Sequence, residues 1–255
     1  MTSLKRTFPW LLHLCQLAVA ELAAKGPSGP VDIGDLAGRL TSDTLGDMLL
    51  GQDFGSMARG AAVDYIALVH AFLAAVQGRI NDPLAKWRVG AEARRVAAAY
   101  AAWDAAMVGV AREVLKATPP EYTIAGARAV GCHLLRVIDP SSGKPLTLDK
   151  LKGELSIFYI AGFETTSHAI TWTLGLLAAH PQQQDALAAE LARVGLAPSD
   201  VHPEPRPFEW GDLSRLPLLN ATIKESLRLF PPVSAAVVAG PNVCRLTCHQ
   251  SYLLP

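Results

Sequence analysis

Apolar side chains recur every three or four residues along most of the chain, and this spacing predicts α-helices. Clusters of proline and glycine separate the helical segments, because neither residue continues a helix well. Only residues 235–239, which read AAVVA, suit a short strand, so the pattern predicts a mainly α fold with little β. Asp32 or Asp35 is the expected N-cap of the second helix. The predicted helices cover residues 7–25, about 33–50, 61–78, 84–116 as one long or two shorter helices, about 124–137, 148–180, 182–194 and 217–230.

The longest predicted helix covers residues 148–180 and follows a hydrophilic turn at residues 139–144. No proline or glycine pair interrupts it before Pro181. At 1.5 Å per residue such a helix is about 50 Å long, which is enough to cross a whole domain. It is therefore the central element of the expected architecture.

The middle of this helix contains an unusual hexapeptide, AGFETT, at residues 161–166. A helical glycine costs about 1 kcal/mol relative to alanine, and threonine hydroxyls bond back to earlier carbonyls, so a locally loosened helix is expected. Two interpretations remain open. Either the segment is a packing kink with Glu164 in solvent, or a flat cofactor lies against Gly162 with Glu164 and Thr165 beside it to deliver protons.

Composition and charge exclude several classes of protein. Half of the residues are hydrophobic and 18% are charged, which excludes disorder as the main state. Lys plus Arg at 23 balance Asp plus Glu at 23, so no nucleic-acid partner is expected. The uncharged residues 7–20 are interrupted by Pro9 and His13 and are shorter than a bilayer span of about 20 residues, so no membrane span is predicted. Four scattered cysteines favour a reducing compartment over a disulfide framework.

A second motif lies in the last predicted helix, where residues 224–233 read KESLRLFPPV. Glu225 and Arg228 are three residues apart and can pair on one helix face. Alone, such a pair is typical of any solvated helix. In this order, however, AGFETT on a long helix, a further helix after Pro181 and then KESLRLFPPV resemble the haem-thiolate monooxygenases, the cytochrome P450 family. Residues 31–55 and 139–151 agree with the same family.

The resemblance implies a partial cytochrome P450 fold, with residues 1–255 as one partial domain and residues 234–255 departing from the family pattern. It implies haem as cofactor, an apolar small-molecule substrate that receives one oxygen atom, and a reductase or ferredoxin as redox partner. It also implies roles for six residues: Thr165 would hydrogen-bond bound oxygen, Glu164 would relay protons, Ala161 and Gly162 would shape the groove above the haem, and Glu225 and Arg228 would be structural. Helix faces within residues 84–116 would roof the substrate pocket.

The cysteine that would ligate the haem iron is not found by its motif. The family loop reads F-x-x-G-x-R-x-C-x-G; Cys244 matches it only at Gly240, and Cys248 matches it nowhere. The expectation is an internal or truncated fragment without the haem-ligand loop, inactive as this chain. The alternatives are a non-catalytic helical binding protein and a gene-model fragment without independent function.

Other metal sites have weaker patterns. A zinc site could use Cys132, His133, Cys244, Cys248 and His249, but the cysteine pairs lack the usual zinc-site spacing. The spacing between Cys244 and Cys248 is one residue longer than in a c-type haem attachment motif. Glu164 and His168 lie four residues apart but have no second such pair. Hydrolase, nicotinamide and phosphate-loop motifs are absent from the sequence.

Overall fold

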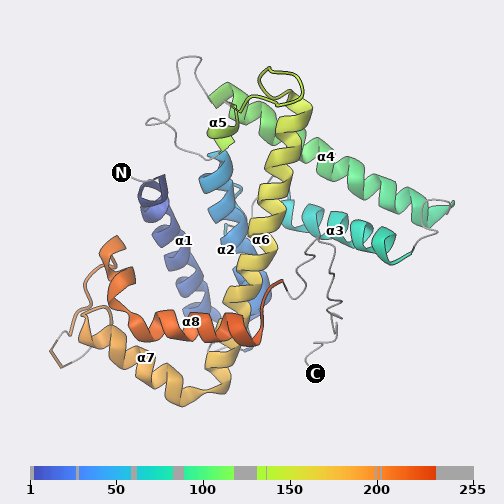
Figure 1. Ribbon diagram of the computed structural model, residues 1–255. Helices are drawn as coiled ribbons and strands as arrows, with labels where there is room; N and C mark the ends of the chain where they lie inside the picture. Colours follow the sequence, from blue (N-terminus) through green and yellow to red (C-terminus); the bar gives the residue numbers. More distant parts are fainter. Residues whose placement is uncertain are drawn as a thin grey trace, which may run out of the picture. The chain divides into compact units, whose positions relative to one another are not determined.

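The computed structural model describes residues 3–26, 29–58, 62–82, 89–117, 131–135, 137–198, 200–201 and 203–233. These residues are mainly α-helical (Figure 1), and within those ranges the one β feature is an isolated bridge between Ile138 and Pro145. The predicted strand at residues 235–239, most of the helix predicted at 124–137, and both C-terminal cysteines lie outside the described residues. The mainly α fold class is confirmed.

Two units divide the chain, Met1–Ser167 and His168–Pro255, and the boundary between them lies inside the long helix α6. The prediction of one partial domain over residues 1–255 stays a prediction. The first unit contains α1 (Ser3–Lys25), α2 (Ile33–Leu45), the π-helix η2 (Gly46–Leu50), α3 (Tyr65–Asn81), α4 (Ala91–Ala117), α5 (Gly131–Leu134) and the first part of α6 (Leu148–Ala179). The second unit contains the rest of α6, α7 (Pro181–Arg193), the 3-10 helix η5 (Trp210–Arg215) and α8 (Pro217–Leu229).

The helix ends follow their local signals. Asp32 is the N-cap of α2 and accepts a hydrogen bond from the backbone N–H of Asp35 at 2.9 Å. Gly51 ends η2 with a φ of 66°, a left-handed conformation that glycine adopts without cost. Pro181 and Pro217 occupy the first turns of α7 and α8, where their missing N–H is harmless. The prediction was wrong at α3, which begins at Tyr65 rather than residue 61, after the N-cap Asp64.

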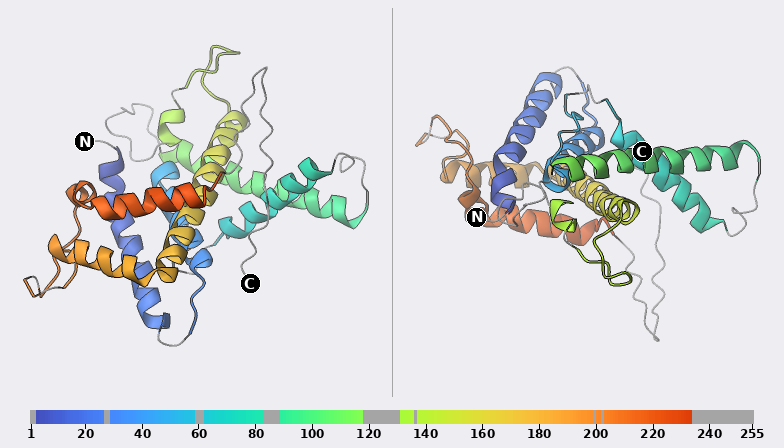
Figure 2. Two further views of the ribbon diagram at one scale, coloured as in Figure 1. Left: turned by 60° about the horizontal axis from the view of Figure 1, so that its bottom comes forward. Right: turned by 90° about the horizontal axis from the view of Figure 1, so that it is seen from above.

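The core of the first unit lies between α2, α3, α4 and α6. Helices α3 and α4 run side by side in all views (Figures 1 and 2). Trp103 of α4 is buried there and donates its indole N–H to Ser156 of α6 at 2.6 Å. A smaller apolar cluster joins α1 to α2. Its buried members are Leu14, Ala18, Leu36 and Met57.

One described helical stretch, Thr7–Lys25, is apolar and long enough to cross a membrane by length and composition. Its Leu14 and Ala18 are buried against α2, although most of its side chains are not buried within the unit. The absence of a membrane span stays a prediction.

One buried carboxylate, that of Asp43, holds the segment that follows η2. Asp43 is 1% exposed, and its two oxygens accept the backbone N–H groups of Ser56 and Met57 at 2.8 Å each. These bonds hold the chain that follows η2 against the end of α2. They also satisfy two buried backbone donors that would otherwise cost free energy.

An ion-pair network joins α1 to α2. The buried guanidinium of Arg39 donates to both carboxylate oxygens of Glu21 at 2.9 Å and to Asp35 at 3.0 Å. Hydrogen bonds from Arg39 and then from Lys25 lower the pKa of Glu21 to about 2. The charged form of Glu21 is therefore the form that the folded chain stabilises.

Stability of the first unit should consequently fall in acid. Because the folded pKa of Glu21 lies below its unfolded value, its contribution is complete above about pH 4.5 and is lost as the pH falls towards 2. We expect Glu21→Gln to destabilise the unit at neutral pH and to converge with the parent chain near pH 2. Urea unfolding at a series of pH values checks this. Glu113→Gln, which breaks an exposed pair with Lys116, is the control at neutral pH; an equal loss there would contradict the assignment.

In the second unit, α6 and α8 are in contact. Thr173 and Ser226 share a hydrogen bond of 3.0 Å, and the rings of Trp172 and Phe230 stack with centroids 4.2 Å apart. Asp212 lies in η5, a short helix in the interval between residues 194 and 217, where the sequence pattern predicts no helix. Its carboxylate accepts two hydrogen bonds from Arg206, at 2.6 and 2.8 Å, which lower its pKa to about 2.

Candidate functional site

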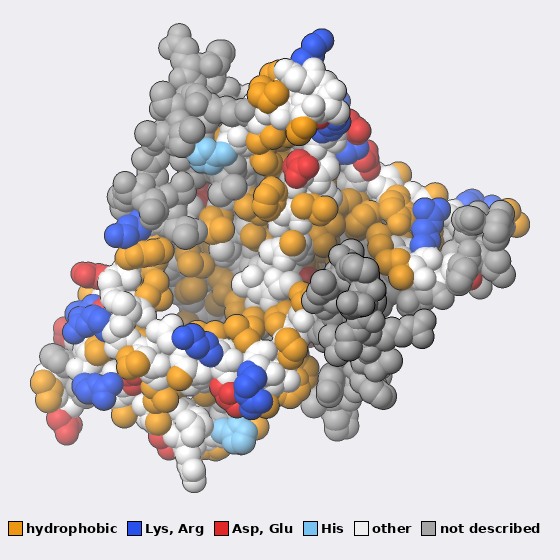
Figure 3. Space-filling view, in the orientation of Figure 1, with side chains coloured by type: hydrophobic (Ala, Val, Ile, Leu, Met, Phe, Trp, Pro, Cys, Tyr) orange, Lys and Arg blue, Asp and Glu red, His pale blue; other side chains and the backbone are white. Residues whose placement is uncertain are grey.

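The AGFETT segment lies inside α6 and presents two different faces. Tyr159 and Phe163 are 0% and 1% exposed and form part of the core of the first unit, where their rings stack 5.7 Å apart. Ala161 is exposed on the opposite side of the helix, and Phe158 is exposed on its flank. Figure 3 shows hydrophobic side chains exposed along this part of α6. The chemistry expected of the segment therefore belongs to the exposed face.

The hydroxyls of the segment bond back to the helix, as their sequence predicts. Thr165 Oγ1 donates to the carbonyl of Ala161 at 2.7 Å, and Ser167 Oγ donates to the carbonyl of Glu164 at 3.1 Å. Nonetheless α6 runs as one α-helix over Leu148–Ala179, so the expected loosening does not break it. Because the Thr165 hydroxyl already donates its hydrogen, its lone pairs remain to accept one.

Glu164 lies on the flank of the same exposed face and is half-buried. It makes no ion pair within the described part of the chain. Its role in a proton relay, like that of Thr165 towards oxygen, stays a prediction.

Gly162 faces another helix. A Cβ atom placed on it would lie 2.9 Å from Cδ2 and 3.2 Å from Cδ1 of Leu45, the last residue of α2. The missing side chain thus admits Leu45, which gives the glycine a packing reason that the sequence pattern did not reveal. The roles of Gly162 and Ala161 in shaping a haem groove stay predictions.

Glu225 and Arg228 pair on α8 in the second unit, as their spacing predicts. The guanidinium donates Nε to one carboxylate oxygen at 2.8 Å and Nη2 to the other at 2.6 Å. Both side chains are more than half exposed, and the pairing lowers the pKa of Glu225. Their structural role behind a haem thiolate stays a prediction. Glu225 and Arg228 belong to the second unit, whereas Glu164 and Thr165 belong to the first.

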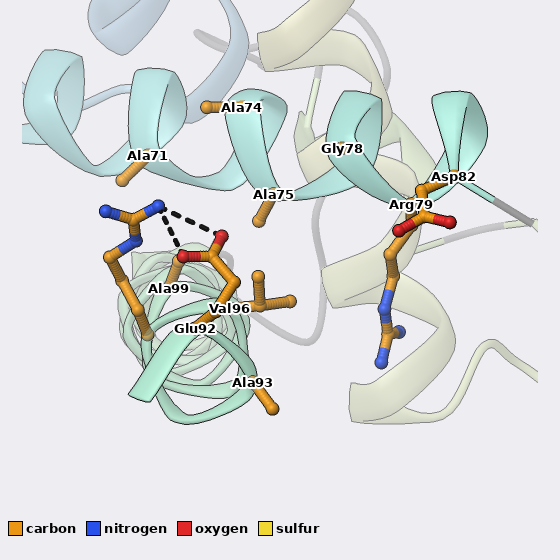
Figure 4. A pocket seen from close by; sticks show the side chains of 11 residues that line it. Ala71, Ala74, Ala75, Gly78, Arg79, Asp82, Glu92, Ala93, Val96 and Ala99 are labelled. Atoms are coloured by element: carbon orange, nitrogen blue, oxygen red, sulfur yellow. Dashed lines mark hydrogen bonds and ion pairs between the residues drawn. The ribbon is translucent and has the colours of Figure 1, made fainter. Parts of the chain in front are cut away.

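Each unit contains a cavity of small-molecule size. In the first unit a cavity of about 470 Å³ lies between α3 and α4, where Ala71 and Ala75 face Val96 and Ala99 (Figure 4). In the second unit a cavity of about 430 Å³ is lined by residues of α6, α7 and α8, including Glu225. Volumes of this order are typical of ligand pockets.

Metal-ligand chemistry is sparse in the ranges that the structure describes. No group of three His, Cys, Asp or Glu side chains is arranged to hold a metal ion there. Cys132 is buried in α5, and Cys15 is half-buried in α1, where burial raises the pKa of its thiol. The zinc and c-type haem patterns involve Cys244 and Cys248, which lie outside those ranges. None of the described residues therefore presents an evident axial thiolate.

Comparisons with known proteins agree on one family. The family model described as Cytochrome P450 matches residues 2–238. Human Cytochrome P450 4F3 is 37% identical and mouse Leukotriene-B4 omega-hydroxylase 3 is 36% identical, each over 113 residues that cover 44% of this chain and 19% of that protein. The solved structure titled Crystal structure of a Cytochrome P450 (CYP102L1) has a TM-score of 0.70 at 19% identity and covers 90% of this chain and 50% of that one.

The matched regions thus span about a fifth of these curated relatives and half of the solved chain. The solved structure agrees with this chain in fold. The family model covers most of the sequence, from residue 2 to residue 238. The chain therefore belongs to the cytochrome P450 family.

Proposed function

We propose that this chain supplies the oxygen-activating wall of a haem-thiolate monooxygenase that inserts one oxygen atom into an apolar organic substrate. One observation carries the proposal: Ala161 and Phe158 lie on an exposed face of α6, with Thr165 and Glu164 beside them, while Phe163 anchors the opposite face in the core. Small and apolar side chains on that face leave room for a flat cofactor and an apolar substrate.

The family implies haem, which when bound supplies the binding and activation of oxygen. The residues present fit this group only in part. The exposed face of α6 offers a wall with one hydroxyl and one acid, but the described residues offer no evident thiolate ligand, and neither C-terminal cysteine has the family's motif. We therefore propose that the 255 residues do not catalyse oxygen insertion on their own.

Within this proposal, the residues of α6 have separate tasks. Thr165, whose hydrogen is held by the carbonyl of Ala161, accepts a hydrogen bond from a group on the exposed face. Glu164 holds or releases a proton beside it. One relative bears the name Leukotriene-B4 omega-hydroxylase 3, and by this likeness we propose an apolar organic molecule as substrate. The family membership implies a reductase or ferredoxin as the electron donor.

The reduced, carbon-monoxide difference spectrum of the purified chain after haem supplementation tests the proposal. We expect no thiolate-shifted band. Cys244→Ser and Cys248→Ser are the matched controls. A shifted band that disappears in one of these variants would show an unconventional thiolate and would overturn the proposed inactivity, whereas ligand-induced thermal stabilisation without haem would favour a non-catalytic binding protein.

A further inference from the structure

We infer that Leu45 is a positioning residue. Its side chain occupies the space left by the absent side chain of Gly162 (the notch) and thereby sets the rotation of α6 about its own axis. This inference deepens the proposed function, because its relevance to chemistry rests on Thr165 acting from the exposed face. The contact itself stands on geometry within the first unit. It gives α2 a function that neither the sequence motif nor the family match assigns.

The notch is tight on both sides. A Cβ at position 162 would meet two terminal atoms of Leu45, at 2.9 and 3.2 Å, distances that force a side chain to move. Leu45 is 7% exposed and is surrounded by core residues, so it has little space to withdraw. The backbone behind it is also confined, since a Cβ on the next residue, Gly46, would lie 2.6 Å from the carbonyl oxygen of Gln52.

Two further contacts lie between the same helices. Ser42 Oγ and the hydroxyl of Tyr159 share a buried hydrogen bond of 2.9 Å. A Cβ on Gly38 would be in ordinary contact with the ring of Phe163, at 3.8 Å. Residues 38, 42 and 45 follow one face of α2 at helical spacing. Three contacts between one face of α2 and one face of α6 define how far α6 is turned.

The rotation matters because the exposed face lies on the other side of the same helix. With side-chain atoms about 5 Å from the axis, a turn of about 20° moves them by about 2 Å. A displacement of that size exceeds the tolerance of a hydrogen bond and of a reacting geometry. The contact between Leu45 and Gly162 therefore fixes the direction in which the Thr165 hydroxyl points.

Thiol labelling tests this without haem. The native cysteines are replaced (Cys15→Ser, Cys132→Ala, Cys244→Ser, Cys248→Ser), and Ala161→Cys or Thr165→Cys is added as reporter. The ratio of the labelling rates at positions 161 and 165 is then measured in three variants and compared with the ratio in the chain without these substitutions. The variants are Gly162→Ala, Leu45→Ala with Gly162→Ala, and Gly153→Ala. Gly153 is the control because a Cβ there meets nothing within 4 Å.

We expect Gly162→Ala to change the ratio several-fold, the double variant to restore it, and Gly153→Ala to leave it unchanged. An unchanged ratio in a folded Gly162→Ala chain, or a double variant that does not restore it, would overturn the inference. If Gly162→Ala does not fold, folding of the double variant supports the notch and its failure to fold counts against it. A thiolate-shifted carbon-monoxide band would overturn the proposed inactivity but would leave these labelling ratios unchanged, so the two proposals can fail separately.

Discussion

Phe163→Ala is expected to lower the free energy of unfolding of the first unit by about 4 kcal/mol. The ring is 1% exposed, stacks on Tyr159 and lies 5.6 Å from the ring of His70. Removing it leaves a cavity that the close contact of α2 and α6 cannot fill. Urea unfolding followed by circular dichroism measures the loss.

Phe158→Ala is the matched control, because it removes the same ring from the same helix five residues earlier. Phe158 is 41% exposed, so its loss is expected to cost about 1 kcal/mol or less. Similar losses for the two variants would show that the faces of α6 are not divided as described. The contrast would also separate residues of the AGFETT region that build the core from residues that are available for chemistry.

Glu190→Ala is expected to destabilise the second unit by about 2 to 3 kcal/mol. This α7 carboxylate is 3% exposed and accepts the backbone N–H groups of Leu218 and Leu219 at 2.8 and 3.0 Å. These N–H groups lie in the first turn of α8 and have no acceptor within the helix, and the helix dipole also favours a negative charge there. The variant leaves two donors without their acceptor.

Amide hydrogen exchange in α8 measures this effect directly. Protection of the first turn should fall in Glu190→Ala, and Glu190→Gln should retain part of it, since one amide oxygen can still accept. Asp185→Ala, an exposed acid of the same helix, is the control and should leave protection unchanged. Equal exchange in all variants would mean that the buried carboxylate does not hold the start of α8.

The helices could be predicted from the sequence because their signals are local. Asp32, Pro181, Pro217 and Gly51 mark helix ends through caps and breaks that need no tertiary contact. The 3-10 helix at Trp210–Arg215 was missed, since it depends on Asp212 accepting from Arg206 and from the backbone of Glu209. Those contacts become visible only after folding.

At the candidate site, contacts within one helix could be predicted from the sequence, whereas contacts between helices could not. The back-bonding of Thr165 and the pairing of Glu225 with Arg228 follow from spacing on one helix, and both are present. The partner of Gly162 is over a hundred residues away in sequence, so no motif could identify Leu45. A glycine beside a cofactor and a glycine beside another helix look identical in a sequence.

Each unit contains one tryptophan whose fluorescence can report its unfolding. Trp103 is buried in the first unit with its N–H bonded to Ser156, and Trp172 lies face to face with Phe230 in the second. Their emission should shift to longer wavelength as each site opens to water. In one variant that keeps only Trp103 and another that keeps only Trp172, the other tryptophans being phenylalanine, the emission wavelength would report at which denaturant concentration each unit unfolds.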